Sequence, residues 1–334
     1  MTSSEVSVTT ETARRLLVEQ APDFAGLPLV QVARGWDNVM FRLGDDLAVR
    51  LPHRASAAHL VESETVALRI LAPRILAPRV QATQAHSPSV LTSPVLASHL
   101  PTDSEAIASP SVLLPETVFL GSPSTSARYP FSWSVVKWVP GRSAVTQSAA
   151  ERRPWASTLG RILAAIHTPD DAALAHRNPY RGTALTSRRE AQDPAVLNKR
   201  LHVAPESDRP ALHHAWSSAL AAPPHTEPPV WLHGDPHPGN LVVGAESTLA
   251  GVIDWGDATS GDPASDLGAL WLTFDAEGRQ AVRDVLNPVV DTAATWQRAA
   301  GWAFLYSTSI AGHPDRDPSL VADARRALAE LATA

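Results

Sequence analysis

The sequence predicts an α+β fold of two lobes, and three observations lead to that prediction. Short apolar runs separated by turn residues dominate residues 1–139 and are typical of an antiparallel sheet. Longer segments with apolar residues three and four positions apart dominate residues 140–334 and are typical of helices. The pattern changes at Pro140-Gly141, two residue types that interrupt both kinds of element. We therefore expect a small sheet-rich N-terminal lobe and a larger, mostly helical C-terminal lobe.

The N-terminal lobe is expected to contain two helices and five strands. The first helix covers residues 7–20, and the second covers 55–71 and ends at Pro73 and Pro78, because proline cannot donate a helical hydrogen bond. A tight hairpin at Gly44-Asp45-Asp46 joins the second and third strands. The five expected strands cover residues 29–33, 38–43, 47–51, 116–120 and 133–139.

Residues 80–113 interrupt this lobe with a stretch of Ser, Thr, Pro, Ala and Gln that has no sustained period. Such composition favours an inserted or flexible surface loop. It could serve as a lid over a nucleotide or have no role in the site, and the sequence leaves both possibilities open.

The C-terminal lobe is expected to be built from successive helices. The clearest covers residues 154–167, where Leu159, Ile162 and Ile166 share one apolar face. Further helices are expected over 211–221, 266–274, 278–286, 293–309 and 320–332, and short strands over 228–232, 241–243 and 251–253.

Composition excludes several classes of function. Of the 334 residues, 44% are hydrophobic and 19% charged, as in a soluble globular enzyme, and the net charge of −6 argues against nucleic acid as a partner. The absence of cysteine excludes disulfides, thiolate nucleophiles and cysteine-bound zinc. No apolar stretch is long enough to span a bilayer, so we expect a cytoplasmic protein without a membrane partner. Either a monomer or a homodimer is compatible with the sequence.

The chemistry is expected at His233-Gly-Asp235-Pro-His237-Pro-Gly-Asn240. Asp235 and Asn240 lie five residues apart across a compact turn, and a following strand ends at Asp254. One carboxylate beside a hydroxyl, with an amide oxygen and a second carboxylate for a hard cation, suffices for phosphoryl transfer. The set predicts a kinase site with bound Mg²⁺.

These residues, with the trailing Ile253-Asp254-Trp255, resemble the aminoglycoside phosphotransferase/choline kinase-like family, which has a protein-kinase-like fold. The resemblance implies that Asp235 is the catalytic residue and that Asn240 and Asp254 bind Mg²⁺. It also implies that an acid of the later Asp262-Pro-Ala-Ser-Asp266 segment supports the lobe and not the chemistry. The implied cofactors are Mg²⁺ and ATP or GTP.

The resemblance extends into the N-terminal lobe. Trp36 and Asn38 fall in the hairpin that covers the nucleotide, and Lys137 and Trp138 fall in the segment that joins the lobes. Arg50 occupies the third-strand position where protein kinases have lysine, and arginine keeps the positive charge for phosphate binding. Its expected partner is Glu64, with Glu62 as the alternative on the same helix.

The implied reaction is transfer of the γ-phosphate to a hydroxyl of a small molecule. An antibiotic is the first expectation, an aminoglycoside before a macrolide, with resistance as the biological outcome. Choline-like, sugar or amino-alcohol metabolites are the alternative, and Asp257 and His237 are candidate substrate contacts. A nucleotide-binding module without catalysis also fits Arg50 in place of lysine.

Simpler interpretations of single residues were weighed beside this one. Asp235 alone could be a turn residue, and His233 is expected to be a structural hydrogen-bonding residue of the loop. The spacing of His233, Asp235 and His237 also occurs in dinuclear metallophosphatases. Those enzymes need further histidine ligands downstream, and the sequence offers little beyond His313.

Overall fold

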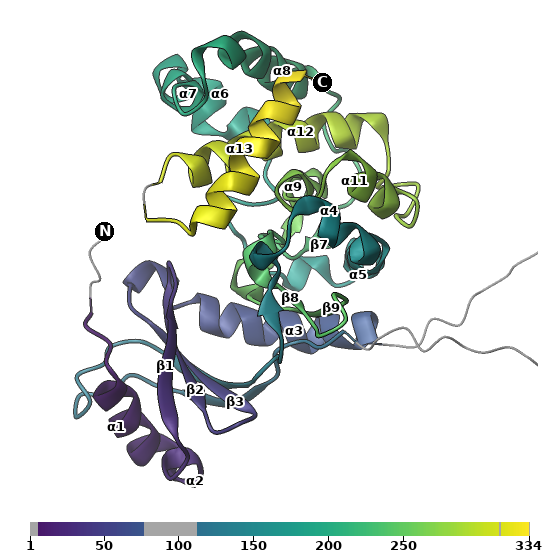
Figure 1. Ribbon diagram of the computed structural model, residues 1–334. Helices are drawn as coiled ribbons and strands as arrows, with labels where there is room; N and C mark the ends of the chain where they lie inside the picture. The colour runs from purple at the N-terminus through teal and green to yellow at the C-terminus, as the bar shows by residue number, and fades with distance from the viewer. Residues whose placement is uncertain (1–5, 77–111, 314, 334) are drawn as a thin grey trace, which may run out of the picture.

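The structure is a computed structural model that describes residues 6–76, 112–313 and 315–333. The N-terminal lobe is a five-stranded antiparallel sheet in the order β1-β2-β3-β5-β4 (Figure 1). The predicted α+β fold of two lobes is confirmed. The elements of this lobe are α1 (Thr10–Gln20), α2 (Pro22–Ala25), β1 (Leu29–Arg34), β2 (Asn38–Leu43), β3 (Leu47–Pro52), α3 (Leu60–Leu76), β4 (Thr117–Gly121) and β5 (Trp133–Lys137).

The two faces of this sheet have different partners. Phe41, Val49 and Val135 lie on one face and form an apolar cluster with Leu16 and Leu17 of α1. Side chains alternate along a strand, so the intervening residues, Arg50 among them, face the other way. The register therefore directs Arg50 to the side of the sheet where α3 lies.

Helix α3 runs past the proline that was expected to end it. Pro73 lies inside the helix, which continues to Leu76. The cost is limited because Pro73 and Arg69 are both exposed, so the carbonyl four residues before the proline can bond to water. The buried residues Ala67, Leu68 and Leu71 hold the helix against the apolar cluster of the C-terminal lobe.

The segment expected to be a loop lies almost wholly outside the described residues. Its last two residues are described, and Leu113 forms a parallel bridge with Gly251. Leu113 donates to the carbonyl of Ala250 and accepts from the amide of Val252. This end of the segment is therefore tied to the edge of a C-terminal strand.

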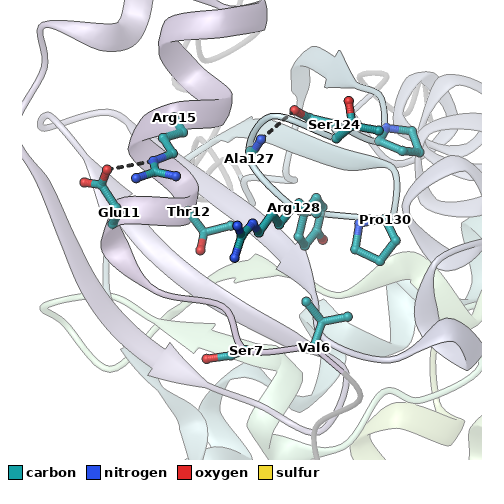
Figure 2. A pocket seen from close by; sticks show the side chains of 12 residues that line it. Val6, Ser7, Glu11, Thr12, Arg15, Ser124, Ala127, Arg128 and Pro130 are labelled. Atoms are coloured by element: carbon teal, nitrogen blue, oxygen red, sulfur yellow. Dashed lines mark hydrogen bonds and ion pairs between the residues drawn. The ribbon is translucent and has the colours of Figure 1, made fainter.

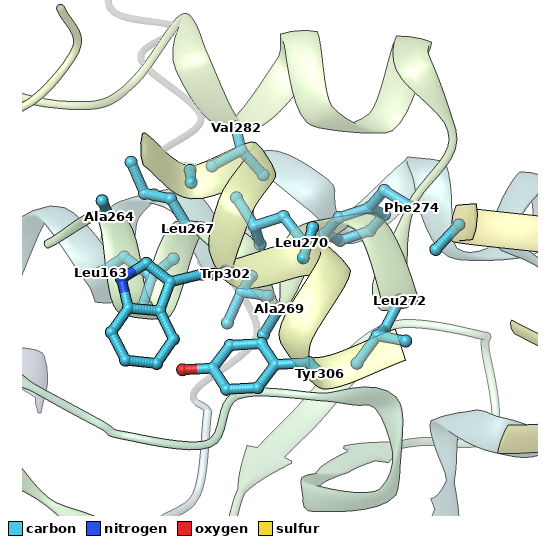
Figure 3. Packing of buried hydrophobic residues seen from close by; sticks show 14 of the residues in the cluster. Leu163, Ala264, Leu267, Ala269, Leu270, Leu272, Phe274, Val282, Trp302 and Tyr306 are labelled. Atoms are coloured by element: carbon cyan, nitrogen blue, oxygen red, sulfur yellow. The ribbon is translucent and has the colours of Figure 1, made fainter. Parts of the chain in front are cut away.

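The C-terminal lobe packs its helices around one apolar cluster, part of which is shown in Figure 3. Trp302 and Tyr306 of α12 lie against the segment that contains Leu267 and Leu270. The helices are α4 (Ala149–Arg152), α5 (Ala156–Ile166), α6 (Arg189–Gln192), α7 (Pro194–Leu201), α8 (Arg209–Ala221), α9 (Ala264–Gly268), α10 (Leu270–Thr273), α11 (Ala276–Arg283), α12 (Ala293–Ala311) and α13 (Pro318–Thr333).

Two small sheets lie where this lobe meets the first. Strands β6 (Arg142–Ser143), β8 (Leu241–Val243) and β9 (Leu249–Val252) form one, and β7 (Val230–Leu232) pairs with β10 (Thr259–Gly261) in the other. The expected segments that flank the acidic motif are therefore strands. In the described ranges, no helix is long and apolar enough to cross a membrane.

Candidate active site

The loop between β7 and β8 carries Asp235 and takes its shape from one glycine. Gly234 has φ +90°, and a Cβ on it would lie 2.2 Å from the carbonyl oxygen of Asp257. Only glycine fits both the backbone angle and this close approach. The contact brings the Asp235 loop against the segment that follows Asp254.

Asp266 fixes this loop from below. Its carboxylate accepts hydrogen bonds from the amides of His233 (2.8 Å) and Gly234 (2.9 Å) and lies 3.1 Å from Nε2 of His167. All these groups are buried. The nearby Asp262 forms a two-pronged ion pair with Arg298, at 2.6 and 3.0 Å. Both acids therefore serve the architecture of the lobe.

The two histidines of the loop are held by backbone groups. The amide of Asp235 donates to Nδ1 of His233 (3.2 Å), which leaves Nε2 to donate to the carbonyl of Ile253 (3.1 Å). The amide of Gly239 donates to Nδ1 of His237 (2.9 Å), so Nε2 of His237 faces the Asp235 carboxylate at 3.4 Å. His233 is thus a structural residue, whereas His237 lies beside the carboxylate.

Asp235 is half-buried between positive partners. Its Oδ1 accepts a hydrogen bond from Nη2 of Arg181 at 3.3 Å, and its Oδ2 faces His237. Burial raises the pKa of the Asp235 carboxyl, but the charges of His237 and Arg181 outweigh burial and hold that pKa well below its usual range. Asp235 is therefore ionised at neutral pH.

Arg181 is a site residue that sequence reasoning missed. It comes from the segment between α5 and α6, which crosses the Asp235 loop, and Asn178 of the same segment donates to Asp257 at 2.7 Å. Neither spacing nor periodicity connects residue 181 with residue 235. Only the tertiary path of this segment brings the guanidinium to the carboxylate.

Asn240 and Asp254 are the two expected cation ligands, and a backbone hydrogen bond connects their segments. The Asn240 amide nitrogen donates to the carbonyl of Asp235 (2.9 Å), so the amide oxygen is the atom left for a cation. The carbonyl of Asn240 accepts from the amide of Ile253 (2.9 Å), which links it to Asp254. Asp254 has φ +62°, and its side chain is half exposed.

This pair fits Mg²⁺ better than a metal bound by protein alone. Within residues 6–76, 112–313 and 315–333, no three His, Asp or Glu side chains gather in a metal-binding group. Mg²⁺ commonly takes one or two protein oxygens and completes its shell with phosphate and water. Asn240 and Asp254 match that mode, and the metallophosphatase alternative has no ligand set in the described residues.

Arg50 and Glu64 form a buried ion pair beside Asp254, as the strand position and helix spacing predicted. The other prong of Arg50 donates to Asp254 Oδ1 at 2.9 Å, and Glu64 accepts from the amide of Trp255 at 3.1 Å. Burial lowers the pKa of Arg50, but Glu64 and Asp254 more than offset this and raise it overall. Arg50 therefore stays positively charged at the strand position where protein kinases have a lysine.

Two other predicted nucleotide contacts lie on the turn between β1 and β2. The Trp36 ring is stacked between the guanidiniums of Arg54 (4.5 Å) and Arg316 (4.8 Å), with the edge of His313 at 4.8 Å. Asn38 closes the turn by accepting from the amide of Gly35 at 2.8 Å. Because Arg316 and His313 belong to the α12–α13 loop, this turn bridges the two lobes.

The structure does not bring Lys137 to this group. In the β3–β5 register Lys137 pairs with Leu47, three residues along each strand from the Arg50–Ser134 pair. Its side chain therefore lies on the opposite face from Arg50, where its ammonium pairs with Glu116 at 2.6 Å. Trp138 is covered by the guanidinium of Arg42 at 4.2 Å, and Arg42 pairs with Ala48, so it lies on the same face of the sheet as Arg50.

Asp257 and Asp37 complete the acidic side of the site. Asp257 accepts from Asn178, and burial together with the charges of Asp235 and Asp254 raises its pKa. Burial, with the charges of Asp254 and Asp257, raises the pKa of Asp37 to about 6. The charges of Asp254 and Asp257 therefore act on Asp37, and those of Asp235 and Asp254 act on Asp257, a repulsion that a bound cation would relieve.

A cavity of about 760 Å³ lies elsewhere, between α1 and the loop that follows β4 (Figure 2). Glu11, Arg15 and Arg128 are among its lining residues, and Arg15 is already paired with Glu11 at 2.8 Å. None of the predicted site residues lines it. The chemistry gathers at the Asp235 loop and not in this cavity.

Comparison with known families identifies the class of this chain. The model of the phosphotransferase enzyme family matches residues 28–302, a span that contains Arg50, Asp235 and Asp254. The chain belongs to this family. The match confirms the predicted enzyme class, a small-molecule kinase with an alcohol group as acceptor.

Solved structures support the predicted protein-kinase-like fold. An APH(2″)-type aminoglycoside phosphotransferase in complex with GDP and kanamycin aligns with a TM-score of 0.64 and 18% identity, over 96% of this chain and 97% of the other. Macrolide 2′-phosphotransferase MphH from Brachybacterium faecium aligns with a TM-score of 0.57 and 19% identity, over 95% and 98%. At these identities the likeness shows the fold.

One curated relative matches over a short stretch. Thiamine kinase of Shigella boydii serotype 4 (strain Sb227) is 36% identical over 72 residues, which cover 21% of this chain and 26% of that protein. The match therefore spans about a quarter of the thiamine kinase.

Proposed function

We propose that this protein transfers the γ-phosphate of Mg²⁺·ATP or Mg²⁺·GTP to a hydroxyl of a small molecule. The observation that carries the proposal is the convergence of the Arg50–Glu64 pair with Asp254, whose neighbour Ile253 bonds to Asn240 in the Asp235 loop. A base, two cation ligands and a buried phosphate-binding guanidinium are the parts that phosphoryl transfer requires. The same convergence argues against a binding module without catalysis.

Arg50 holds the phosphates in this mechanism. Glu64 and Asp254 fix its guanidinium from two sides, so it is oriented before the nucleotide arrives. When bound through Asn240 and Asp254, Mg²⁺ would neutralise the phosphate charge. Arg50 thus does the work of the lysine found in protein kinases.

Asp235 orients the acceptor. Because its pKa is low, the carboxylate is ionised and accepts a hydrogen bond from the substrate hydroxyl. The hydroxyl oxygen bonds to the γ-phosphorus, the bond from phosphorus to the β–γ bridging oxygen breaks, and the nucleoside diphosphate leaves. The hydroxyl proton passes to Asp235 and then to water. A weak base suffices because the transition state is loose and the proton leaves late.

Antibiotics are the first acceptors to test. The sequence favours an aminoglycoside before a macrolide, and phosphotransferases for both are among the structural neighbours. The short thiamine kinase match adds metabolite alcohols as the second candidate. A cytoplasmic location, where nucleoside triphosphates are available, belongs to the same proposal.

Asp235→Asn tests the proposal with nearly unchanged size. We expect transfer to fall by roughly three orders of magnitude or more, because the hydroxyl loses its acceptor, while nucleotide affinity stays within a few-fold. Purified protein with Mg²⁺ and ATP or GTP is assayed against a panel of aminoglycosides, macrolides and metabolite alcohols, and nucleotide binding is followed by calorimetry. Exposed Asp284→Asn is the matched control. Wild-type turnover by Asp235→Asn would contradict the assignment.

A further inference from the structure

Asp235 is flanked by more positive charge than its own ionisation requires. Arg181 contacts it directly, and the charge of Arg316 interacts with it across the cleft. The charge of Arg188 also acts on this group through Arg181. The Glu190 carboxylate lies 3.8 Å from Arg188 but only 2.8 Å from Arg200, so Glu190 pairs mainly with Arg200. Arg181 therefore contacts Asp235, and the positive charges of Arg188 and Arg316 lie close enough to act on Arg181.

Arg181 has unused hydrogen-bonding capacity. A guanidinium has five N–H donors, and within the described ranges Arg181 uses one of them, on Asp235. Its Nε is buried and has no hydrogen-bond partner there. The ring of Tyr306 supports the guanidinium from one side at 4.9 Å, and Tyr306 is itself fixed by Ser265 at 2.8 Å. The remaining donors are held in place for an acceptor group.

Arg316 lies in the loop between α12 and α13. It stacks on Trp36, and its Nε is buried with no hydrogen-bond partner in the part of the chain that the structure describes. Burial lowers the pKa of Arg316 and the charges of Asp235 and Asp37 partly offset this, but neither acid forms an ion pair with Arg316 in the described residues. Arg316 is thus a partly buried cation that has no ion-pair partner among the residues the structure describes.

Two of the nearby acids are already engaged. Asp254 accepts from Arg50, and Asp257 accepts from Asn178. Asp37 is half-buried with a raised pKa, and Asp235 has to face the substrate hydroxyl in the proposed reaction. A polycation such as an aminoglycoside would meet the charges of Arg181 and Arg316 there, and like charges oppose binding. The charges around Asp235 therefore favour an acceptor of another class than the aminoglycoside that the sequence puts first.

We propose that the acceptor carries an anionic group, such as a phosphate or carboxylate, which Arg181 and Arg316 bind beside the hydroxyl that is phosphorylated. This inference rests on the proposed function and specifies the class of substrate. Arginine suits the task because its planar fork binds such anions in two-pronged fashion. When Arg181 turns to the anion, Oδ1 of Asp235 becomes free for the hydroxyl. The substrate thus uncovers the carboxylate that it needs.

The test uses inorganic phosphate as the probe. Wild-type protein is first saturated with Mg²⁺ and a non-hydrolysable ATP or GTP analogue, so that the nucleotide fills its own phosphate positions. Phosphate is then titrated by calorimetry. We expect saturable binding that weakens roughly tenfold or more in Arg181→Met and in Arg316→Met, because each loses charged hydrogen bonds. Arg177→Met, exposed on the same segment as Arg181, should bind as the wild type does.

Several results would overturn the inference. They are absence of phosphate binding to the nucleotide-loaded protein, equal affinity in all variants, and binding seen only without nucleotide. The last would assign both arginines to the γ-phosphate, as would a parallel loss of nucleotide affinity in the variants. Arg181→Lys, which keeps the charge, should retain part of the affinity and guards against a folding defect. If the wild type fails to bind Mg²⁺·nucleotide at all, the proposed function itself is wrong.

Discussion

The pKa of the Asp37 carboxyl is raised to about 6 by burial and by the charges of Asp254 and Asp257. Asp37 is half-buried on the turn between β1 and β2. The folded protein therefore binds this proton more tightly than the unfolded chain, whose aspartate titrates near 3.8. As pH rises from 4 to above 6, the folded state loses stability, by at most about 3 kcal/mol.

Asp37→Asn should remove this penalty. Above pH 7, in the absence of metal and nucleotide, we expect the melting temperature to rise relative to the wild type. At pH 4.5, where Asp37 is already protonated in the folded state, the gain should shrink toward zero. Thermal denaturation at several pH values measures the difference, with exposed Asp23→Asn as the control. A gain of equal size at both pH values would contradict the account.

Sequence reasoning at the level of single residues succeeded where function fixes spacing. Asp235 and Asn240 are five apart in one loop, so the sequence alone placed them together. Arg181 and Arg316 join them from segments far along the chain. A cation brought from a distant, aperiodic segment leaves no local signal, and these two could not be predicted.

At the scale of elements, the site depends on the contact between β3 and α3. Arg50 on the strand and Glu64 on the helix are buried together, at 7% and 1% exposure. Glu64 also accepts from Trp255, so one side chain connects strand, helix and the segment after Asp254. The position of α3 is therefore tied to the geometry of the phosphate and metal ligands.

Glu64→Ala should destabilise the protein by about 3–5 kcal/mol, because it leaves Arg50 charged and buried without its partner. It should also weaken nucleotide binding, since Arg50 loses its fixed orientation. Glu62→Ala on the same turn of α3 is the matched control, because Glu62 is exposed and, in the described part of the chain, accepts a hydrogen bond from the exposed Ser132 side chain at 3.1 Å. Urea denaturation compares the two variants. A Glu64→Ala effect no larger than that of Glu62→Ala would exclude this role.

Long periodic elements were predicted well, whereas two of the short strands were missed. The strand at Asn38–Leu43 and the helix α12 were predicted to within two residues, because their own hydrophobic period defines them. Strands β6 and β10 have two and three residues and exist only as partners of β8 and β7. The expected helix end at Pro73 was wrong because tertiary packing of α3 overrides a local signal.

At the scale of the molecule, two apolar clusters hold the fold. One lies under the N-terminal sheet, and the other fills the C-terminal lobe and includes buried residues of α3. Helix α3 thus belongs to the first lobe by chain order and to the second by packing. The division of the chain into two lobes at residues 139 and 140 stays a prediction. The apolar cluster of the C-terminal lobe includes residues of α3, which precede that division in the sequence.

Gly141 is the residue on which the path between the lobes turns. Its φ is +140°, and a Cβ would lie 2.5 Å from the carbonyl oxygen of Val243. Gly141→Ala should therefore destabilise the protein by more than about 1 kcal/mol. Gly26→Ala, where a Cβ meets nothing within 4 Å, should have little effect. Equal denaturation midpoints for the two variants would show that the turn at 141 tolerates a side chain.

The sequence by itself predicted the reaction class, which the family match confirms, and pointed to the residues proposed to carry it. Spacing within one loop and the end of the next strand specified Asp235, Asn240 and Asp254, and strand position specified Arg50. Tertiary structure alone decided which charges surround Asp235, which face of the sheet Lys137 occupies, and where α3 packs. The reason is physical: chemistry at one loop is encoded in contiguous residues, whereas the acceptor site forms between segments that meet only in the folded chain.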